Sequence, residues 1–361
     1  MRAARFYGKG DIRVDEISPP DCGPNDLRVQ IGYAGICGTD IHEYLAGPIF
    51  PPKPGETHPY SGAELPVILG HEVAGTIIEV GSEVKTRVAI IPAMDERHYG
   101  LEPCNMCQRG RRNICKRTAY RGLNAPGGGF ANEAVVTEHD ILLLLDDISL
   151  QLGALLEPLA VAWHMVRTAG MQQGDNCVIL GAGPIGLALL LVLKFRGAGK
   201  IIVSEVTASR AEIAKQFGAD QVINPLAATN TSEDIVVSAA HDLMDDGADI
   251  AFDASGIQAT FDTAIACTRP GGTIFNVAIH EKPLSIHLND LTTLEKKLTG
   301  GICYTREDLE GALELVKADK TKVEKMITAV TPLEETVKGG FVEFLENKGM
   351  HVKSLIEVKR E

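Results

Sequence analysis

A glycine-rich turn between two apolar segments constrains the fold more than any other feature of this chain. Residues 181–186 read Gly-Ala-Gly-Pro-Ile-Gly, and they stand between the apolar run 176–180 and an apolar stretch over 185–195. This spacing predicts a buried strand, a tight turn and a helix. A second apolar run, 200–204, supplies a parallel partner strand. The sequence therefore predicts an α/β fold with a doubly wound parallel sheet in this part of the chain.

The same turn predicts a dinucleotide site. Gly181 permits the sharp bend, Gly183 lets the backbone approach a pyrophosphate, and Gly186 packs the helix close to the strand. Pro184 and Ile185 complete the turn. We expect all five residues to bind the cofactor.

The residue after the second strand predicts which cofactor binds. Glu205 stands where an acid accepts hydrogen bonds from the adenosine ribose, and its charge would repel a 2′-phosphate. Val206 adds no positive charge there. NAD is therefore favoured over NADP, although Arg210 is a nearby cation that complicates the choice and is kept among the cofactor-binding residues.

Three other stretches hold residue types that bind a catalytic metal. They contain Cys37, the adjacent pair His71 and Glu72, and Glu157. One thiolate, one imidazole and two carboxylates suit zinc, which accepts sulfur, nitrogen and oxygen ligands in one tetrahedron. The pattern leaves open which of Glu72 and Glu157 touches the metal and which acts through water.

Each of these residues has a structural alternative. A free cysteine such as Cys37 is usually a small buried hydrophobe, His71 can be a satisfied core histidine, and Glu157 can be a helix N-cap. Because proline is tolerated at the first helical position, Pro158 predicts a helix start that leaves Glu157 free to face a cleft. The joint occurrence of the three stretches favours the metal site.

Two side chains in the Cys37 segment predict a route for a proton. A zinc-bound alcohol has a lowered pKa, and its proton needs groups that both donate and accept on the way to solvent. We expect Thr39 and then His42 to provide that route, with Asp40 orienting His71 through its ring N–H. A metal beside a nicotinamide points to an alcohol-oxidising dehydrogenase.

Length and charge limit the partners of the chain. At 361 residues it exceeds what one hydrophobic core usually supports, so two domains are expected. Its 35 Lys and Arg against 48 Asp and Glu give a net charge of −13, which argues against nucleic acid and against an anionic membrane. We find neither an apolar signal segment nor an apolar run that could span a bilayer, and expect a cytoplasmic protein.

The two halves of the chain have different patterns. Before residue 150, strand-like runs occur at 27–34, 67–69, 75–80 and 87–92, and the Pro- and Gly-rich segment 50–62 is predicted to be a loop. Later, residues 209–212 predict a capping box for a second helix. Further predicted elements are strands at 249–255 and 273–277, helices at 307–316 and 338–347, and a strand at 351–356. The last three are expected to return to the first domain.

Together these motifs resemble the zinc-containing medium-chain dehydrogenase family over essentially the whole chain. The matching segments are 35–40, 70–75, 127–131 and 181–186. The resemblance implies a GroES-like, β-rich catalytic domain over 1–151 and 291–361, a Rossmann domain over 152–290, and a homodimer or homotetramer.

The resemblance also implies roles for individual residues. The catalytic zinc ligands fall on Cys37, His71 and one or both of Glu72 and Glu157. The proton relay falls on Thr39 and His42.

Within this family the chain is similar to the polyol and diol branch, in which a glutamate replaces a cysteine of other alcohol dehydrogenases. Residues 157–164 carry that similarity, and 47–50, 65–72 and 298–308 resemble (R,R)-butanediol dehydrogenases more closely than sorbitol dehydrogenases. The implied reaction is reversible NAD-linked oxidation of a vicinal diol, such as 2,3-butanediol, to its hydroxyketone. A sorbitol-like polyol dehydrogenase is the nearest alternative. A zinc-free reductase of the same superfamily and a non-catalytic protein are more distant ones.

One departure from the family concerns its structural zinc lobe, which has the pattern C-x2-C-x2-C-x7-C. Cys104, Cys107 and Cys115 match the last three positions, but Leu101 occupies the first and cannot bind zinc. The other side chains considered for the fourth position are Glu102, His98 and Asp95. Because structural sites use four protein ligands, we expect an empty or weakened site.

Overall fold

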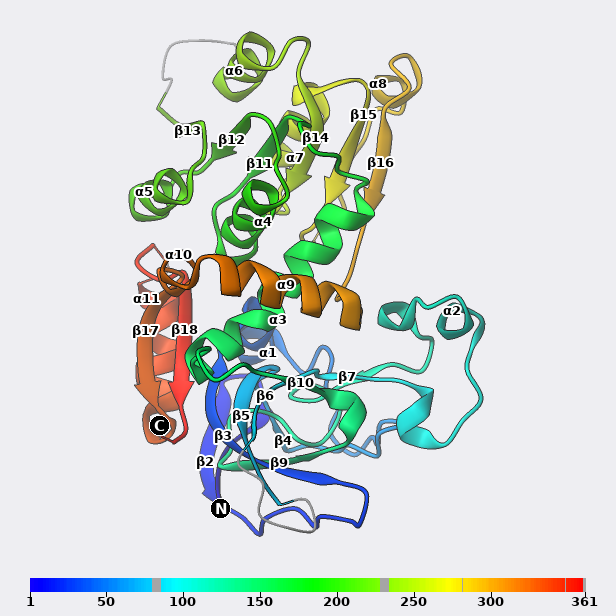
Figure 1. Cartoon of the computed structure of the whole chain (residues 1–361), viewed down its shortest axis with the longest axis vertical. Helices are drawn as coiled ribbons and strands as arrows, with labels where there is room; N and C mark the ends of the chain where they lie inside the picture. The colour runs from blue at the N-terminus through cyan, green and yellow to red at the C-terminus, as the bar shows by residue number, and fades with distance from the viewer. Residues whose placement is uncertain (80–85, 228–233, 281, 348, 360–361) are drawn as a thin grey trace. The chain divides into compact units, whose positions relative to one another are not determined.

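The computed structural model describes residues 1–79, 86–227, 234–280, 282–347 and 349–359 (Figure 1). Two compact units divide the chain. Unit 1 comprises Met1–Glu157 and Val316–Glu361, and unit 2 comprises Pro158–Leu315. The domain boundaries suggested by the sequence, at 151/152 and 290/291, stay a prediction.

Unit 1 is built around a seven-stranded sheet. Six strands follow the order β10-β6-β5-β3-β18-β17, and β9 also pairs with β3. Their bounds are β3 Leu27–Gly35, β5 Glu72–Glu79, β6 Thr86–Ile90, β9 Glu133–Val136, β10 Ile141–Leu143, β17 Ile327–Pro332 and β18 Lys353–Glu357. Smaller sheets are formed by β1 Arg2–Gly8, β2 Asp11–Glu16 and β4 Val67–Ile68, and by β7 Ala93–Met94 and β8 Ala119–Tyr120. These strands overlap those predicted at 27–34, 67–69, 75–80 and 87–92, and residue 80 lies outside the described residues.

The C-terminal strand β18 lies inside this sheet, between β3 and the edge strand β17. β18 pairs antiparallel with β3, so that Leu355 lies opposite Gly35, and it pairs parallel with β17 on its other side (Figure 1). The chain from Val316 onward therefore completes the unit that its beginning starts, whereas the predicted helix at 307–316 lies almost entirely in unit 2. Large side chains from both parts share one core, in which the rings of Phe130 and Phe341 meet edge to face at 6.1 Å.

Unit 2 is a six-stranded parallel sheet in the order β13-β12-β11-β14-β15-β16, which is the strand order of a dinucleotide-binding fold (Figure 1). The strands are β11 Cys177–Leu180, β12 Ile201–Ser204, β13 Gln221–Ile223, β14 Ala248–Asp253, β15 Thr268–Asn276 and β16 Lys297–Gly300. The helices are α4 Pro184–Phe195, α5 Ala208–Phe217, α6 Ile235–Leu243, α7 Gln258–Cys267 and α8 Asn289–Thr292. The predicted doubly wound sheet is confirmed.

Alternation along β11 explains why helices cover both faces of the sheet. Val178 and Leu180 belong to the apolar cluster that also contains residues of α6 and α7. Ile179 points to the opposite face, where α4 begins so close that a Cβ at Gly186 would lie 3.5 Å from its side chain. A strand without polar residues is thus buried on both sides.

Three predicted helix boundaries differ in the structure. Helix α3 runs over Leu150–Thr168 with Pro158 inside it, so the prediction that a helix starts at Pro158 is wrong. Its first turn is capped instead by Ser149, whose Oγ accepts the backbone N–H of Leu152 at 3.2 Å. Proline removes one helical hydrogen bond, but the buried Leu156 and Leu159 on either side of it keep the helix continuous.

Helix α5 begins at Ala208 with Thr207 as its N-cap, so Ser209 lies inside the helix and the predicted capping box is wrong. Glu205 accepts the Thr207 N–H at 2.7 Å and so fixes the turn before the helix. The helix predicted over 338–347 is a π-helical turn, η5 Thr336–Val342, followed by the short α11 Glu343–Glu346. The predicted helix at 307–316 lies within α9 Arg306–Ala318, which is followed by α10 Lys320–Glu324.

Candidate functional site

The end of β3 presents Cys37 at the start of a helix. Cys37 is the N-cap of α1 Gly38–Ala46, and its backbone N–H donates to Asp40 Oδ2 at 2.9 Å. Asp40 is fully buried, and its other oxygen accepts the backbone N–H of Gly70 at 3.3 Å. One carboxylate therefore fixes the backbone beside Cys37 and the backbone before His71.

A glycine with positive φ sets the backbone direction before His71. Gly70 has φ of +90°, and a Cβ there would lie 2.8 Å from the ring of Phe130. The Gly70 carbonyl accepts the N–H of Gly129 at 2.7 Å, so the glycine-rich segment 127–131 packs directly against this turn. His71 follows, and it is 8% exposed. This close backbone approach explains the glycines that the sequence motif contains.

The side chains of Cys37, His71 and Glu72 converge. One potential ligand atom from each lies within 4.8 Å of the others. His71 Nδ1 lies 3.6 Å from Asp40 Oδ1 and has no hydrogen-bond partner within the described part of the chain, although it is buried. A thiol, an imidazole with an unsatisfied nitrogen and a carboxylate at these separations fit a tetrahedral zinc ion.

Glu72 is also held by a buried lysine that the sequence analysis did not identify. Lys353 Nζ donates to both carboxylate oxygens, at 2.6 and 2.8 Å, and to the carbonyl of Ile36 at 3.3 Å. The side chains of Lys353 and Glu72 are each 1% exposed. Burial lowers the pKa of Lys353, but Glu72, Cys37 and Glu157 together raise it more, so its net pKa is above the ordinary value. Lys353 therefore stays charged and neutralises Glu72.

Glu157 lies in α3, directly before Pro158, and belongs to the same unit. Desolvation raises the pKa of its carboxyl to about 7; His71 opposes this shift, and the negative charge of Glu72 adds to it. Burial lowers the pKa of His71, but Asp40 and Cys37 raise it more, to well above its ordinary value. Without a metal, this region thus holds protons that a cation would displace.

Thr39 and His42 lie three residues apart on α1, a spacing that places two side chains on one face of a helix. Thr39 Oγ1 lies 3.8 Å from Cys37 Sγ. Both residues keep part of their surface exposed. A hydroxyl beside the thiol and an imidazole one turn further on are the arrangement that a proton path requires.

The glycine turn in unit 2 has the geometry that its sequence predicts. Gly181 has φ of +102°, and a Cβ at Gly186 would lie 1.9 Å from the carbonyl of Gly181. A Cβ at Gly183 would meet no atom within 4 Å, which leaves open space at the start of α4. Positive φ, close packing and an open approach are the three glycine properties that a pyrophosphate-binding turn uses.

Glu205 is tied to this turn. One carboxylate oxygen accepts the N–H of Ala182 at 2.7 Å and the other accepts the N–H of Thr207 at 2.7 Å. Arg210 is partly buried in the first turn of α5. Pro184 and Ile185 open α4 directly after the turn. The structure thus brings the predicted cofactor-binding segments together at the carboxyl ends of β11 and β12.

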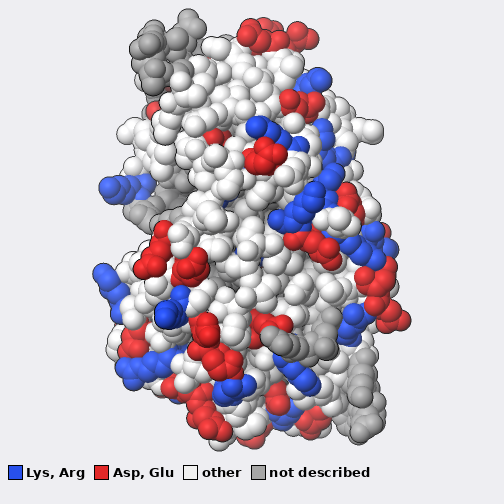
Figure 2. Space-filling model, turned by 90° about the vertical axis from the view of Figure 1, so that its left-hand side faces the viewer, with Lys and Arg blue, Asp and Glu red and all other residues white. Residues whose placement is uncertain are grey.

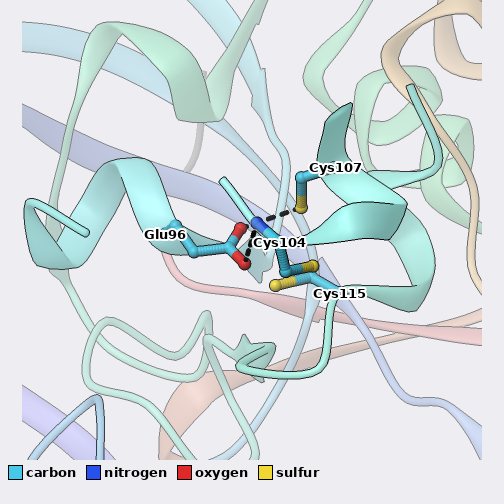
Figure 3. Close-up of side chains that lie close together, drawn as sticks. All are labelled: Glu96, Cys104, Cys107 and Cys115. Carbon is cyan, nitrogen blue, oxygen red and sulfur yellow. Dashed lines mark hydrogen bonds between the residues drawn. The ribbon is translucent and has the colours of Figure 1, made fainter. Parts of the chain in front are cut away.

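A second group of possible metal ligands lies in unit 1, away from these residues in sequence. Glu96, Cys104, Cys107 and Cys115 each place a ligand atom within 4.8 Å of the others (Figure 3). Glu96 was not among the candidates for the fourth position. His98 and Asp95, which were, bond elsewhere: His98 Nε2 lies 2.6 Å from Asp140, and Asp95 accepts from Arg97. Glu102 is exposed.

Comparison with known proteins decides the family. Residues 23–147 match the family model for an alcohol dehydrogenase GroES-like domain, and residues 184–318 match that for a zinc-binding dehydrogenase. The chain is 38% identical to the (R,R)-butanediol dehydrogenase of Saccharomyces cerevisiae over 99% of this chain and 98% of that protein. It belongs to the zinc-containing medium-chain dehydrogenase family.

Other members of this family extend the comparison. The crystal structure of 2R,3R-butanediol dehydrogenase from Bacillus subtilis superposes with a TM-score of 0.90 at 32% identity, covering 99% of both chains. L-idonate 5-dehydrogenase of Vitis vinifera is 32% identical over 90% of this chain and 86% of its own length. The predicted family and fold class are therefore confirmed. The protein is an oxidoreductase whose cofactors are zinc and a nicotinamide dinucleotide.

In the view of Figure 2, Lys and Arg side chains lie among Asp and Glu side chains on the described surface. This distribution accompanies a net charge of −13. Among the described residues, no helix has the length and apolar character needed to cross a membrane.

Proposed function

We propose that this dehydrogenase oxidises a vicinal diol of the 2,3-butanediol class to its hydroxyketone, reversibly and with NAD. The convergence of Cys37, His71 and Glu72 carries the proposal, in a chain whose glycine turn is hydrogen-bonded to the acid Glu205. Glu157 interacts electrostatically with His71 and Glu72. The diol class is supported by the butanediol dehydrogenases among its relatives.

We assign the catalytic zinc to Cys37, His71 and Glu157. Glu72 already has Lys353 as its partner, whereas desolvation raises the pKa of the Glu157 carboxyl to about 7. When bound, zinc supplies a Lewis acid that lowers the pKa of a substrate hydroxyl, and NAD supplies a two-electron acceptor. The protein positions these groups: Asp40 anchors the backbone at Cys37 and Gly70, and Lys353 keeps Glu72 in place. Zinc retained by a Glu157→Gln variant but lost from Glu72→Gln would reassign the carboxylate.

The proton released by the substrate hydroxyl leaves through Thr39 and His42. Thr39 Oγ1 accepts a proton as it gives its own to the next group, and the His42 imidazole passes it to solvent. This direction follows from the position of Thr39 beside Cys37 and of His42 one turn later on α1. Thr39 and His42 each return to their starting protonation state at the end of the cycle.

NAD is the proposed acceptor because Glu205 would meet a 2′-phosphate with a negative charge. Two backbone N–H groups hold this carboxylate at the edge of the turn. Arg210 lies on α5 rather than at the end of β12.

An assay of NAD and NADP reduction with the stereoisomers of 2,3-butanediol, with sorbitol and with L-idonate tests the proposal. We expect the highest kcat/KM with one butanediol stereoisomer and NAD. A higher value with sorbitol or L-idonate would move the protein to the polyol branch. No oxidation of any alcohol by zinc-loaded protein would contradict the proposal as a whole.

Removing the Thr39 hydroxyl should slow turnover without removing the metal. Thr39→Val is expected to lower kcat about a hundredfold or more, because assisted proton transfer contributes at least that factor in many enzymes. Thr39→Ser retains the hydroxyl and should stay within a few fold of the parent. Steady-state kinetics with zinc analysis checks both, and a valine variant as active as the serine variant would remove Thr39 from the proton path.

We further propose that the protein is a cytoplasmic homo-oligomer. β16 lies at one end of the parallel sheet, and its four residues are all exposed, with Leu298 42% exposed. An exposed edge strand is a template for pairing with a second copy. All eight cysteines are unpaired by disulfides, which suits a reducing compartment. Sedimentation equilibrium showing a monomer would contradict the oligomer.

A further inference from the structure

We propose that the lobe over residues 95–117 binds a second zinc ion through Cys104, Cys107, Cys115 and the carboxylate of Glu96. This ligand comes from outside the cysteine motif, five residues before Leu101. The proposal concerns a site separate from the catalytic residues and does not depend on which alcohol is oxidised. It replaces our expectation of an empty or weakened site.

The local fold directs Glu96 inward and Leu101 outward. Glu96 is the first residue of the short helix η1 Glu96–Tyr99, which Asp95 caps by accepting the N–H of Arg97 at 3.0 Å. The carbonyl of Glu96 accepts the N–H of Leu101 at 3.0 Å. This turn leaves Leu101 41% exposed, whereas Glu96 is 1% exposed. The position that carries cysteine in the family therefore lies at the surface, and a carboxylate lies inside.

The carboxylate faces the sulfurs directly. Glu96 Oε2 lies 2.8 Å from Cys107 Sγ, and Oε1 accepts the backbone N–H of Cys104 at 3.0 Å (Figure 3). The three cysteines are all buried. Zinc bonds of about 2.3 Å to sulfur and about 2.0–2.2 Å to oxygen place tetrahedral ligands well under 4.8 Å apart, so the observed cluster needs only small side-chain movements.

The combined charge of the three cysteine thiolates and Glu96 favours a divalent cation at this site. Three thiolates, one carboxylate and Zn²⁺ sum to −2, the same as four thiolates and Zn²⁺, so replacing a cysteine by glutamate leaves the net charge of the site unchanged. Arg117 offsets part of it, because its Nη1 lies 3.4 Å from Glu96 Oε1. The Arg117 backbone N–H also donates to Cys115 Sγ at 3.3 Å.

A bound metal ion stabilises a lobe most when its helices are as short as those of residues 95–117. Within the lobe the structure describes only η1, α2 Asn105–Gln108 and η2 Arg112–Ile114, of three or four residues each. The apolar cluster around the cysteines contains only Met106 besides. Segments this short cannot supply a core of their own, so a metal that ties three of them together supplies folding free energy.

Zinc counting by elemental analysis tests the site. We expect two zinc ions per wild-type chain, one in Glu96→Gln and two in the matched control Glu102→Gln, which removes an exposed carboxylate of the same lobe. Cys37→Ser should retain one ion and Cys37→Ser with Glu96→Gln none, so that the lobe is counted apart from the catalytic zinc. A Cys37→Ser protein without zinc, or a Glu96→Gln protein with two, would overturn the proposal.

A second measurement uses the unmodified protein, so its result does not depend on whether a variant folds. Alkylation of Cys104, Cys107 and Cys115 can be followed peptide by peptide by mass spectrometry, with and without a chelator. We expect the chelator to accelerate their alkylation at least tenfold while the buried Cys177 stays unreactive. Equal rates with and without the chelator would mean that these cysteines hold no metal.

Discussion

Replacing Cys37 with serine is expected to lower diol turnover at least about a thousandfold. The thiolate is the only sulfur ligand in the proposed catalytic set, and the Lewis acid that it helps to hold contributes several kcal/mol to catalysis, where each 1.4 kcal/mol is a factor of ten. The measurement is kcat with saturating NAD and diol, together with zinc content and the apparent Tm.

Cys22→Ser is the matched control for this experiment. Cys22 is a partly exposed cysteine of the same unit, and its replacement should leave kcat and zinc content unchanged. A Cys37→Ser enzyme that turns over diol at the wild-type rate would rule out catalysis by a zinc ion at this position.

The second large effect concerns the buried pair of Glu72 and Lys353. Lys353→Met should lower the free energy of unfolding by about 3–5 kcal/mol, because it leaves the Glu72 carboxylate buried without its cation. Glu72→Leu with Lys353→Met should recover most of that loss, since a buried ion pair and apolar residues of similar volume are often nearly equal in stability. Denaturant unfolding of metal-free protein measures both without a contribution from zinc.

An exposed lysine near the same end of the chain provides the comparison. Lys359→Met removes a charge at the surface and should change stability by no more than about 0.5 kcal/mol. If Lys353→Met behaves like Lys359→Met, the carboxylate of Glu72 does not need its partner. If the double variant is as unstable as the single one, the loss comes from packing around Lys353 rather than from an unpaired charge.

The sequence predicted those parts of the molecule that short-range patterns determine. The turn over 181–186 has a spacing that few structures satisfy, and the apolar run 176–180 has no polar face, so the parallel sheet followed from both. Cys37, Thr39 and His42 lie within six residues and share one helix start. In each case the residues that interact are close together along the chain.

Errors arose where another interaction overrode the preference of a single residue. Pro158 favours a helix start, but buried leucines on both sides extend α3 through it. Ser209 favours an N-cap, but Glu205 fixes the turn two residues earlier. The first outcome depends on burial against neighbouring elements, whereas the second depends on a local hydrogen bond between Glu205 and Thr207 that the capping-box pattern does not include.

Two functional side chains were missed because neither lies within the motif that it contacts. Lys353 stands 281 positions from its partner Glu72. The signal that could have found it is a lysine two residues before the apolar pair Leu355 and Ile356 of the closing strand. Glu96 lies outside the cysteine spacing, and only the reversal of the chain at η1 brings it to the sulfurs.

The position of β18 also sets the order in which this protein can mature during synthesis. Unit 2 is one continuous segment, from Pro158 to Leu315, and can complete its sheet while translation continues. Unit 1 waits for β18, which lies between β3 and β17 and carries the cation that Glu72 needs. We therefore expect unit 2 to fold on the ribosome before unit 1, and we expect a nascent chain stalled before Lys353 to bind dinucleotide without being an active enzyme.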